Sequence, residues 1–371
     1  MKTYNGRLEK IESSGLMRKL LVKKPGMLEF SSNDYLGLAN HPALKEASIK
    51  AIKRYGSSVA SSRLMCGNIQ LHEDLETRLA RLTRMEAALL FGSGFLANVG
   101  LINCITSRDD LIFSDKLNHA SLVDGARLSR ARVARYKHCD MEHLEYLLSH
   151  SECRGQRYIV TDSLFSMDGD IAPLRLLEKL AKSFDCNLVV DEAHAIGVFG
   201  EGGGICREYG IKPHAIVGTL SKALGSYGGF VSCNEDMKKY LVNRARTFIY
   251  STGLPPAAPA AALAAVDIIE TQPDYGRILL GNASDFRCLL KPSIFSSEPS
   301  ESQIVPIQIG DNLKALALAD RLLEEGISTV AVRPPTVPDG TARVRLSVTL
   351  SHSREDLHHT ADVLNSIGSE V

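Results

Sequence analysis

The sequence lacks several features that would place a chain of 371 residues in a common class. It has no Trp, and its 43 Lys and Arg balance its 43 Asp and Glu, so the formal net charge is zero and nucleic acid is not an expected partner. Residues 1–26 carry charges throughout, and no apolar run reaches the roughly 20 residues of a bilayer span, so neither a signal peptide nor a membrane anchor is expected. The eight cysteines include no Cys-x-x-Cys pair, which argues against a zinc site and a disulfide framework and favours a reducing, cytoplasmic location.

Apolar runs alternate with helix-like stretches from about Leu71 onward. The runs are AALLFG, DLIFSD, RYIVTDS, NLVVDEAH and AIVGTLSK. Strands that are apolar throughout and separated by helices are typical of a mostly parallel sheet covered on both faces. The sequence therefore predicts an α/β fold, in which ligands bind beyond the carboxyl ends of the strands.

The pattern changes near Gln272. ESQIVPIQIG, LKALALADRLLEEG, TARVRLSVTL and SREDLHHTADVLNSIG are typical of a smaller α+β domain. We expect an N-terminal segment over residues 1–40, a large α/β domain over 41–271 and a small C-terminal domain over 272–371.

The run NLVVDEAH is compatible with two chemistries. Asp-Glu-Ala-His after an apolar strand holds Mg²⁺ in many helicases, but that site also needs a Gly-x-x-x-x-Gly-Lys-Ser/Thr loop for the phosphates. The sequence contains no Gly-Lys dipeptide and no basic runs interleaved with aromatics. A helicase or other nucleotide-binding module is therefore the remote alternative.

The other chemistry is that of a pyridine-ring cofactor. Pyridoxal phosphate (PLP) needs a lysine for a Schiff base, a carboxylate for the ring nitrogen, and amides and hydroxyls for the phosphate. Asp191 closes an apolar strand, and His194 follows it by three residues at the level expected for the ring hydroxyl. Lys222 lies on a strand-end turn among glycines, with Thr219 three residues earlier as a phosphate ligand. A lone Ser-Lys is more often a solvated surface pair, so this interpretation depends on the whole set.

Three further strand ends supply candidate residues. GSGFLANVG opens a helix after a strand, so the amides of Gly94 and Phe95 are candidates for phosphate binding. His119, after DLIFSD, is a candidate for stacking on the ring, although a residue at a helix start with Asn118 as N-cap is the simpler interpretation. Ser166 ends another strand and is a candidate cofactor ligand, with a turn role as the alternative.

In this order, the segments of the chain resemble the α-oxoamine synthases, which are PLP-dependent enzymes of the aspartate-aminotransferase fold (fold type I). The segments are FSSNDYLGL, SRLMCG, LHEDLE, FGSGFLAN, NHASLVDGARLS, FSMDGDIAPL, VVDEAHAIGVFG, VGTLSKALGSYGGF, FIYSTGLPPA, SQIVPIQIGDN and RPPTVPDGTARVRLS. They cover nearly the whole chain.

The resemblance implies the role of each matched residue. Lys222 would bind the cofactor covalently, Asp191 would pair with the pyridine nitrogen, His194 would bond the ring hydroxyl and His119 would stack on the ring. Ser166, Thr219 and the amides of Gly94 and Phe95 would complete the cofactor contacts. The expected substrate ligands are Arg345, for the amino-acid carboxylate, with Thr349, Asn33, His119 and Arg18. For Arg345, a charge on an edge strand is the alternative.

The resemblance also implies the reaction. It is the decarboxylative condensation of L-alanine with a pimeloyl thioester of coenzyme A or an acyl-carrier protein, a step of biotin synthesis, in a homodimer where Ser251 and Thr252 approach the neighbouring subunit's phosphate. Condensation of glycine with acetyl-CoA is the alternative within the family. Two segments depart from the family pattern: the loop GSSVASSRLMCG, which is expected near the substrate, and Gly204, where an arginine is usual.

Overall fold

The computed structural model describes residues 4–20, 22, 25–292 and 300–367. It forms two compact units, which we call the large unit (residues 36–165 and 171–277) and the small unit (residues 1–35, 166–170 and 278–371). The N-terminal stretch and the short segment 166–170 thus belong to the same unit as the C-terminal part. The domain limits drawn from the sequence stay a prediction, since compact units defined by contacts need not coincide with domains.

The large unit is built on a seven-stranded sheet of order β2-β8-β7-β6-β5-β3-β4. Its strands are β2 (Ala87–Phe91), β3 (Leu111–Asp115), β4 (Arg132–Tyr136), β5 (Arg157–Asp162), β6 (Cys186–Asp191), β7 (Ala215–Thr219) and β8 (Gly229–Cys233). Only β8 runs antiparallel to its two neighbours, and the other pairs are parallel. The predicted mostly parallel α/β sheet is confirmed.

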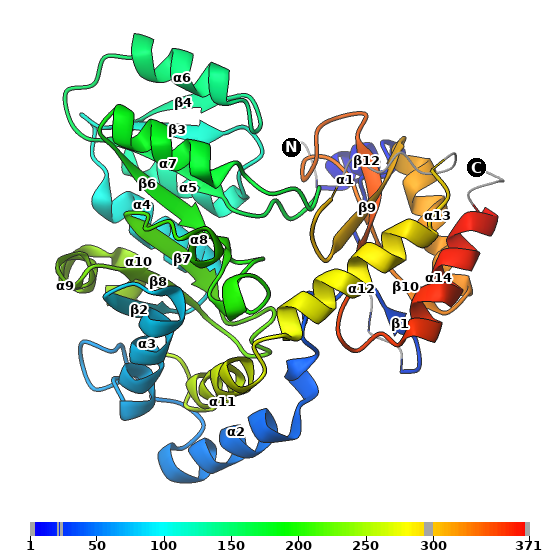
Figure 1. Ribbon diagram of the computed structural model, residues 1–371, viewed down its shortest axis with the longest axis horizontal. Coiled ribbons are helices and arrows are strands. Elements are labelled where there is room, and N and C mark those ends of the chain that lie inside the picture. The colour runs from blue at the N-terminus through cyan, green and yellow to red at the C-terminus, as the bar shows by residue number, and fades with distance from the viewer. Residues whose placement is uncertain (1–3, 21, 23–24, 293–299, 368–371) are drawn as a thin grey trace. The chain divides into compact units, whose positions relative to one another are not determined.

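Helices lie on both faces of this sheet (Figure 1). They are η1 (Leu38–Asn40), α2 (Pro42–Tyr55), α3 (Gln70–Thr83), α4 (Gly94–Ile105), α5 (Ala120–Ser129), α6 (Met141–His150), α7 (Leu174–Ser183), η2 (Gly200–Gly202), α8 (Ile205–Tyr209), α9 (Glu235–Arg244), α10 (Arg246–Ile249) and α11 (Ala257–Thr271). Strands β2, β3, β7 and β8 are buried along their whole length, which explains why most of their residues are apolar.

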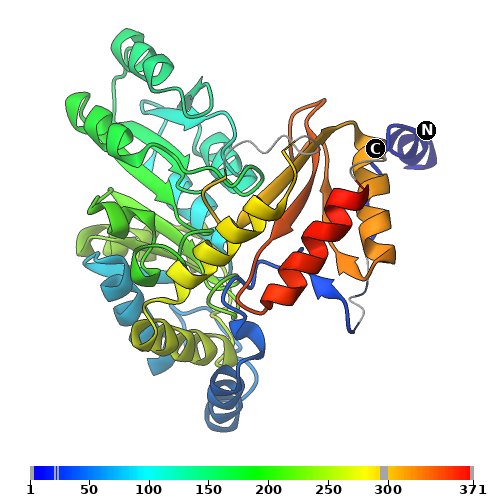
Figure 2. The ribbon, with the colours of Figure 1, turned by 45° about the vertical axis from the view of Figure 1, so that its right-hand side comes forward.

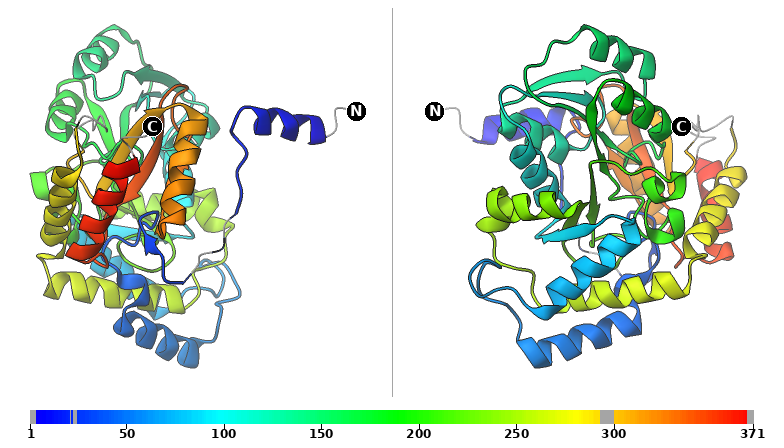
Figure 3. Two further views of the ribbon diagram at one scale, coloured as in Figure 1. Left: turned by 90° about the vertical axis from the view of Figure 1, so that its right-hand side faces the viewer. Right: turned by 60° about the vertical axis from the view of Figure 1, so that its left-hand side comes forward.

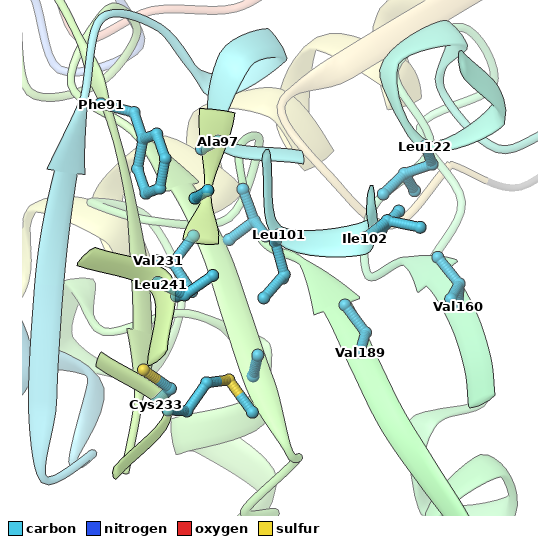
Figure 4. Close-up of a cluster of buried hydrophobic side chains, with 14 of the residues drawn as sticks. Phe91, Ala97, Leu101, Ile102, Leu122, Val160, Val189, Val231, Cys233 and Leu241 are labelled. Carbon is cyan, nitrogen blue, oxygen red and sulfur yellow. The ribbon is translucent and has the colours of Figure 1, made fainter. Parts of the chain in front are cut away.

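The core beneath α4 and α5 fixes these helices on the sheet (Figure 4). Leu101 and Ile102 of α4 and Leu122 of α5 belong to the same buried cluster as Val160 of β5 and Val189 of β6. A fully buried side chain of this size contributes about 1.5–3 kcal/mol. This packing holds the amino ends of both helices at the carboxyl edge of the parallel strands, where the candidate residues lie.

The small unit contains a three-stranded antiparallel sheet of order β11-β12-β9 and a two-stranded parallel pair, β1 with β10. The strands are β1 (Leu28–Glu29), β9 (Ile304–Gly310), β10 (Ile327–Ser328), β11 (Val330–Val332) and β12 (Ala342–Ser347), and the helices are α1 (Tyr4–Ser13), α12 (Tyr275–Leu289), α13 (Asn312–Glu324) and α14 (Arg354–Ile367). Helices α13 and α14 lie side by side against the three-stranded sheet (Figures 2 and 3). Among the described residues, no helix combines the length and apolarity needed to cross a bilayer.

Candidate active site

Asp191 is a buried carboxylate at the carboxyl end of β6, with 5% of its surface exposed. Its Oδ2 accepts a hydrogen bond from Asn98 Nδ2 at 2.6 Å, and its Oδ1 accepts one from the Ala193 N–H at 2.8 Å. Both donors are neutral. Because a buried charge is costly unless it is paired, the carboxylate is suited to a cationic ligand such as a protonated pyridine nitrogen. His194, also buried, follows it on the same loop.

Lys222 lies on the turn between β7 and β8, and its side chain is half-buried. The turn is closed at its base by hydrogen bonds from Thr219 Oγ1 to the Gly228 carbonyl (2.9 Å) and from the Gly228 N–H to Ser221 Oγ (3.1 Å). A lysine on so tightly closed a turn is held next to the strand ends rather than free on a long loop.

The charge of Lys222 affects the pKa values of two other residues near the strand ends, His119 and Asp162. Burial by surrounding groups lowers the pKa of His119, the Asp191 carboxylate opposes that shift, and the Lys222 ammonium adds to it. Burial raises the pKa of Asp162 well above its usual range, the Asp191 charge adds to the rise, and Lys222 opposes it. Lys222, Asp191 and His119 therefore act on one another within a single neighbourhood.

The amino end of α4 forms an anion site next to Thr219. Ser93 is the N-cap, and its hydroxyl accepts a hydrogen bond from the Leu96 N–H at 3.2 Å. A Cβ on Gly94 would lie 3.4 Å from Thr219 Cβ, and a Cβ on Gly229 would lie 2.3 Å from the Gly94 nitrogen. Glycines thus keep this helix end uncovered beside β7 and β8, as binding of a phosphate at helix amides requires.

His119 is itself the N-cap of α5, with its ring accepting a hydrogen bond from the Ser121 N–H. The expectation that Asn118 caps this helix is wrong, because the Asn118 side chain donates instead to the Val160 carbonyl at 2.7 Å. His119 as a residue is exposed, although its imidazole is partly covered by neighbouring groups, and the Phe95 ring meets that imidazole edge to face with the centroids 6.4 Å apart. A partly exposed imidazole is suited to contact with a planar ligand.

Thr252 lies beside the loop that departs from the family pattern. Ser62 and Thr252 form an isolated antiparallel bridge, and the Gly253 N–H donates to the Ser61 carbonyl at 3.0 Å. The loop is therefore connected through its backbone to the YSTGL segment that contains Ser251.

Gly204, the other departure, lies against the buried carboxyl group of Glu192. A Cβ at Gly204 would approach the Glu192 carboxyl carbon to 2.9 Å, and the Gly204 φ is +98°. Burial raises the pKa of Glu192, and hydrogen bonds from the Cys206 and Ile205 N–H groups oppose the rise. A side chain at position 204 would be strained by this backbone conformation and would push against the Glu192 carboxyl group.

The small unit holds Arg345 in a separate cluster. Arg345 is on the central strand β12 and is 6% exposed, so the interpretation of an edge-strand charge is wrong. The guanidinium donates to the Ser166 carbonyl (2.5 Å), Ser347 Oγ (2.8 Å), Asn33 Oδ1 (3.1 Å) and the Tyr35 hydroxyl (3.2 Å). All four acceptors are neutral, which leaves the charge of this cation suited to a carboxylate ligand.

The remaining predicted substrate residues make other contacts. The Thr349 hydroxyl lies 3.4 Å from His352 Nδ1, and Arg18 Nη2 donates to Thr336 Oγ1 at 3.1 Å. The small unit thus brings Asn33 and Ser166 to Arg345, whereas the hydrogen bonds of Thr349 and Arg18 given above go to His352 and Thr336. The large unit brings together Gly94, Phe95, His119, Asp191, Thr219 and Lys222.

Three residues of the large-unit site are absent from the sequence-based set: Asn98, Ser121 and Asp162. Asp162 closes the run RYIVTD as Asp191 closes NLVVD, so the same pattern identifies it. Asn98 follows Gly94 by four residues, which places it on the same side of α4. Ser121 carries no signal beyond its place in the first turn of a helix.

The chain belongs to the family described as aminotransferase class I and II, whose model matches residues 25–364. It is 44% identical over 384 residues to the 8-amino-7-oxononanoate synthase of Geobacter metallireducens (99% of this chain, 98% of the relative). It is 42% identical over 388 residues to the enzyme of that name from Geotalea daltonii (100% and 99%). The fold is similar to that of a serine palmitoyltransferase from S. paucimobilis with bound PLP-myriocin aldimine, with a TM-score of 0.92 and 27% identity over 99% of this chain and 97% of that chain.

Proposed function

We propose that the chain is a PLP-dependent acyltransferase that condenses L-alanine with a pimeloyl thioester to give 8-amino-7-oxononanoate, CO₂ and free thiol. The observation that carries this proposal is the buried Asp191 carboxylate, which accepts hydrogen bonds from two neutral donors, Asn98 Nδ2 and the Ala193 N–H, and acts electrostatically in one neighbourhood with Lys222. Relatives more than 40% identical along the full chain carry the name of this activity.

The residues of the large unit fit PLP group by group. Asp191 would hold a proton on the pyridine nitrogen, and His194 would bond the ring hydroxyl. The uncovered amino end of α4 and Thr219 would hold the phosphate, together with Ser166 and with Thr252 from a second subunit. When bound, PLP supplies an electron sink for negative charge at the amino-acid Cα.

The protein's own groups then handle the protons. Lys222 would hold the cofactor covalently and, as the free amine, would be the base that removes the Cα proton. The hydrogen bonds that close its turn restrict the positions that the lysine can reach. His119 would stack on the ring and contact the substrate. Asp191 would keep the pyridine nitrogen protonated so that the ring can take up negative charge, and a fixed carboxylate in a buried site needs no reorganisation for this role.

Arg345 is the proposed ligand of the amino-acid carboxylate. Its guanidinium group is held in place by hydrogen bonds to the Ser166 carbonyl, Ser347 Oγ and Asn33 Oδ1, which lie on three segments of the small unit. A guanidinium that is already fixed in this way loses little conformational freedom when it binds a carboxylate. Asn33, Thr349 and Arg18 are proposed as further substrate ligands.

The proposal also covers the acyl donor, the oligomeric state and the cellular location of the enzyme. Either a coenzyme A or an acyl-carrier-protein thioester can provide the pimeloyl group, the enzyme acts as a homodimer, and it works in the cytoplasm. The second candidate function is condensation of glycine with acetyl-CoA. It applies if the departing loop, which is joined to the Thr252 segment, controls the length of the acyl chain.

A matrix of substrates distinguishes the two functions. PLP-loaded protein is assayed for thiol release and product mass with L-alanine or glycine and with pimeloyl-CoA or acetyl-CoA, with Lys222→Ala as the inactive control. We expect the highest kcat/KM with L-alanine and pimeloyl-CoA. An apolar pocket distinguishes substrates that differ by one methylene by roughly 10- to 200-fold in kcat/KM, so the preference should be large enough to measure. A clear preference for glycine and acetyl-CoA would instead assign the second function to the protein.

A further inference from the structure

Two side chains without an assigned role connect Asp191 to His119. Asn98 Nδ2 donates to Asp191 Oδ2 at 2.6 Å and to Ser121 Oγ at 2.9 Å. Ser121 Oγ in turn lies 2.7 Å from His119 Nδ1, and the Ser121 N–H reaches the same nitrogen at 3.3 Å. A continuous chain of hydrogen bonds therefore runs from the carboxylate to the imidazole.

The packing of α4 on α5 builds this network. Asn98 is 1% exposed and Ser121 is fully buried. One turn after Ser121, Gly125 lets the two helices approach so closely that a Cβ there would lie 3.2 Å from the Asn98 carbonyl oxygen and 3.1 Å from Ile102 Cβ. The network is thus part of the helix interface and not a chance surface contact.

The direction of each hydrogen bond follows from the one before it. An ionised carboxylate only accepts, so Asn98 must turn its NH₂ group to Asp191, because the reverse orientation would place two oxygens 2.6 Å apart. The second N–H of Asn98 goes to Ser121 Oγ, which leaves the Ser121 hydroxyl proton for His119 Nδ1. Among the described residues, no hydrogen-bond donor contacts the buried Asn98 Oδ1, so this orientation carries the cost of an unpaired carbonyl oxygen.

We propose that Asn98 and Ser121 are positioning residues that fix His119 in the tautomer with its proton on Nε2, so that His119 acts in the reaction as a hydrogen-bond donor and not as a base. The role in the reaction rests on the proposed function, which supplies the acceptor. The tautomer itself is a property of the chain and can be measured separately.

The charged groups around His119 are consistent with a neutral ring. Asp191 of β6 and Asp124 of α5 favour its protonation, whereas Lys222 opposes it, and burial lowers the pKa of the ring. Asp162 Oδ2 accepts the backbone N–H of His119 at 2.8 Å and leaves the ring nitrogens unaffected. Phe95 adds only an apolar edge.

The tautomer is read from ¹⁵N solid-state NMR of sedimented protein labelled in the histidine ring nitrogens, with and without PLP. The His119 signals are identified by their loss in His119→Gln. We expect an unprotonated Nδ1 and a protonated Nε2 in the wild type. Ser121→Ala should change the tautomer ratio by about fivefold, which is the effect of one hydrogen bond, and Ser121→Thr should restore it. Ser232→Ala is the matched control, because Ser232 is also fully buried and its hydroxyl has no partner.

Asn98→Asp tests the direction of the network. In either protonation state, the carboxyl oxygen introduced beside Ser121 accepts the serine proton, so Ser121 Oγ must accept from His119 and the imidazole proton moves to Nδ1. In kinetics, Ser121→Ala should lower kcat, with recovery in Ser121→Thr.

Two results would overturn the proposal: a wild-type His119 that carries its proton on Nδ1, or a Ser121→Ala protein with the wild-type tautomer ratio. Failure of the proposed function looks different. A protein that does not bind PLP yet shows the Nε2–H tautomer and its loss in Ser121→Ala would refute the proposed function and leave the assignment of the network intact.

Discussion

Asp162 and Asp191 are directly paired in the register of the parallel strands β5 and β6, so two buried carboxyl groups lie side by side at the carboxyl edge of the sheet. Two like charges so close cannot both ionise easily. Asp162 is the carboxyl group whose pKa is raised, by burial and by the charge of Asp191. Burial and the charge of Asp191 therefore disfavour the ionised form of Asp162, and we assign the pairing with a pyridinium to Asp191.

This difference predicts different outcomes for two matched variants. Asp162→Asn replaces a carboxyl group whose ionised form is disfavoured by a neutral group of similar shape, so the free energy of unfolding and PLP affinity should change by less than about 1 kcal/mol. Asp191→Asn removes the charge that pairs with the ring, and PLP affinity should fall by roughly 10- to 100-fold. Titration of cofactor-free protein with PLP measures both. Equal losses in the two variants would contradict the assignment.

The uncovered amino end of α4 depends on Gly229. A Cβ there would lie 2.3 Å from the Gly94 nitrogen and from the Ser93 carbonyl carbon, so Gly229→Ala must displace the helix start. We expect a loss of about 1–3 kcal/mol in unfolding free energy and at least a tenfold weaker affinity for PLP. Gly281→Ala on α12 is the control, because a Cβ there meets nothing within 4 Å and should be neutral or stabilising. A Gly229→Ala protein with wild-type PLP affinity would show that the phosphate binds elsewhere.

Arg345 is expected to determine amino-acid binding. Arg345→Lys keeps the positive charge but loses the planar guanidinium that can donate two hydrogen bonds to one carboxylate. The KM for L-alanine should therefore rise by about tenfold or more, while PLP affinity stays unchanged. Arg343→Lys is the matched control, because Arg343 is on the same strand and pairs with Asp168 instead. Steady-state kinetics with varied L-alanine makes the comparison. A rise in KM of the same size in both variants would argue for a general effect on β12.

Acid should destabilise the protein through buried histidines. His72 is fully buried, with Nε2 3.0 Å from the Leu254 carbonyl and Nδ1 accepting the Ile69 N–H, and burial lowers its pKa. Because the unfolded chain then binds more protons, stability is full above about pH 6.5 and is lost as the pH falls through the folded-state pKa.

The contribution of His72 to this loss can be separated by substitution. Each such group contributes up to about 1.4 kcal/mol per pH unit, and His72→Gln should reduce the slope of unfolding free energy against pH, measured by urea unfolding. His358→Gln, at an exposed position of α14, should leave it unchanged. An unaltered slope in His72→Gln would assign the acid sensitivity to other groups.

Much of the large unit could be predicted because its strands are buried on both faces. Runs such as NLVVD and AIVGT are apolar throughout, and the polar residue that closes each run marks the ligand edge. Asp191, Lys222 and the Gly94 helix start were all identified in this way. The PLP-dependent family that the motifs indicated is confirmed by the comparisons.

The rest depends on contacts between segments far apart in the chain. Asn98 and Ser121 meet only because two helices pack closely at Gly125, and no local pattern encodes that approach. Asparagine is a common N-cap residue, but the Asn118 side chain donates a hydrogen bond to the Val160 carbonyl of the neighbouring strand, and His119 caps the helix instead. The position of Arg345 on a central strand likewise follows from strand order, which the sequence does not reveal.

The most direct test of the account is the location of the covalent bond to the cofactor. PLP-loaded protein is reduced with borohydride, digested and mapped by mass spectrometry, with Lys222→Ala treated in parallel. The account predicts one pyridoxyl group, on the peptide that contains Lys222, and none in the variant. A pyridoxyl group on a different lysine, or its absence from the wild type, would contradict the central claim.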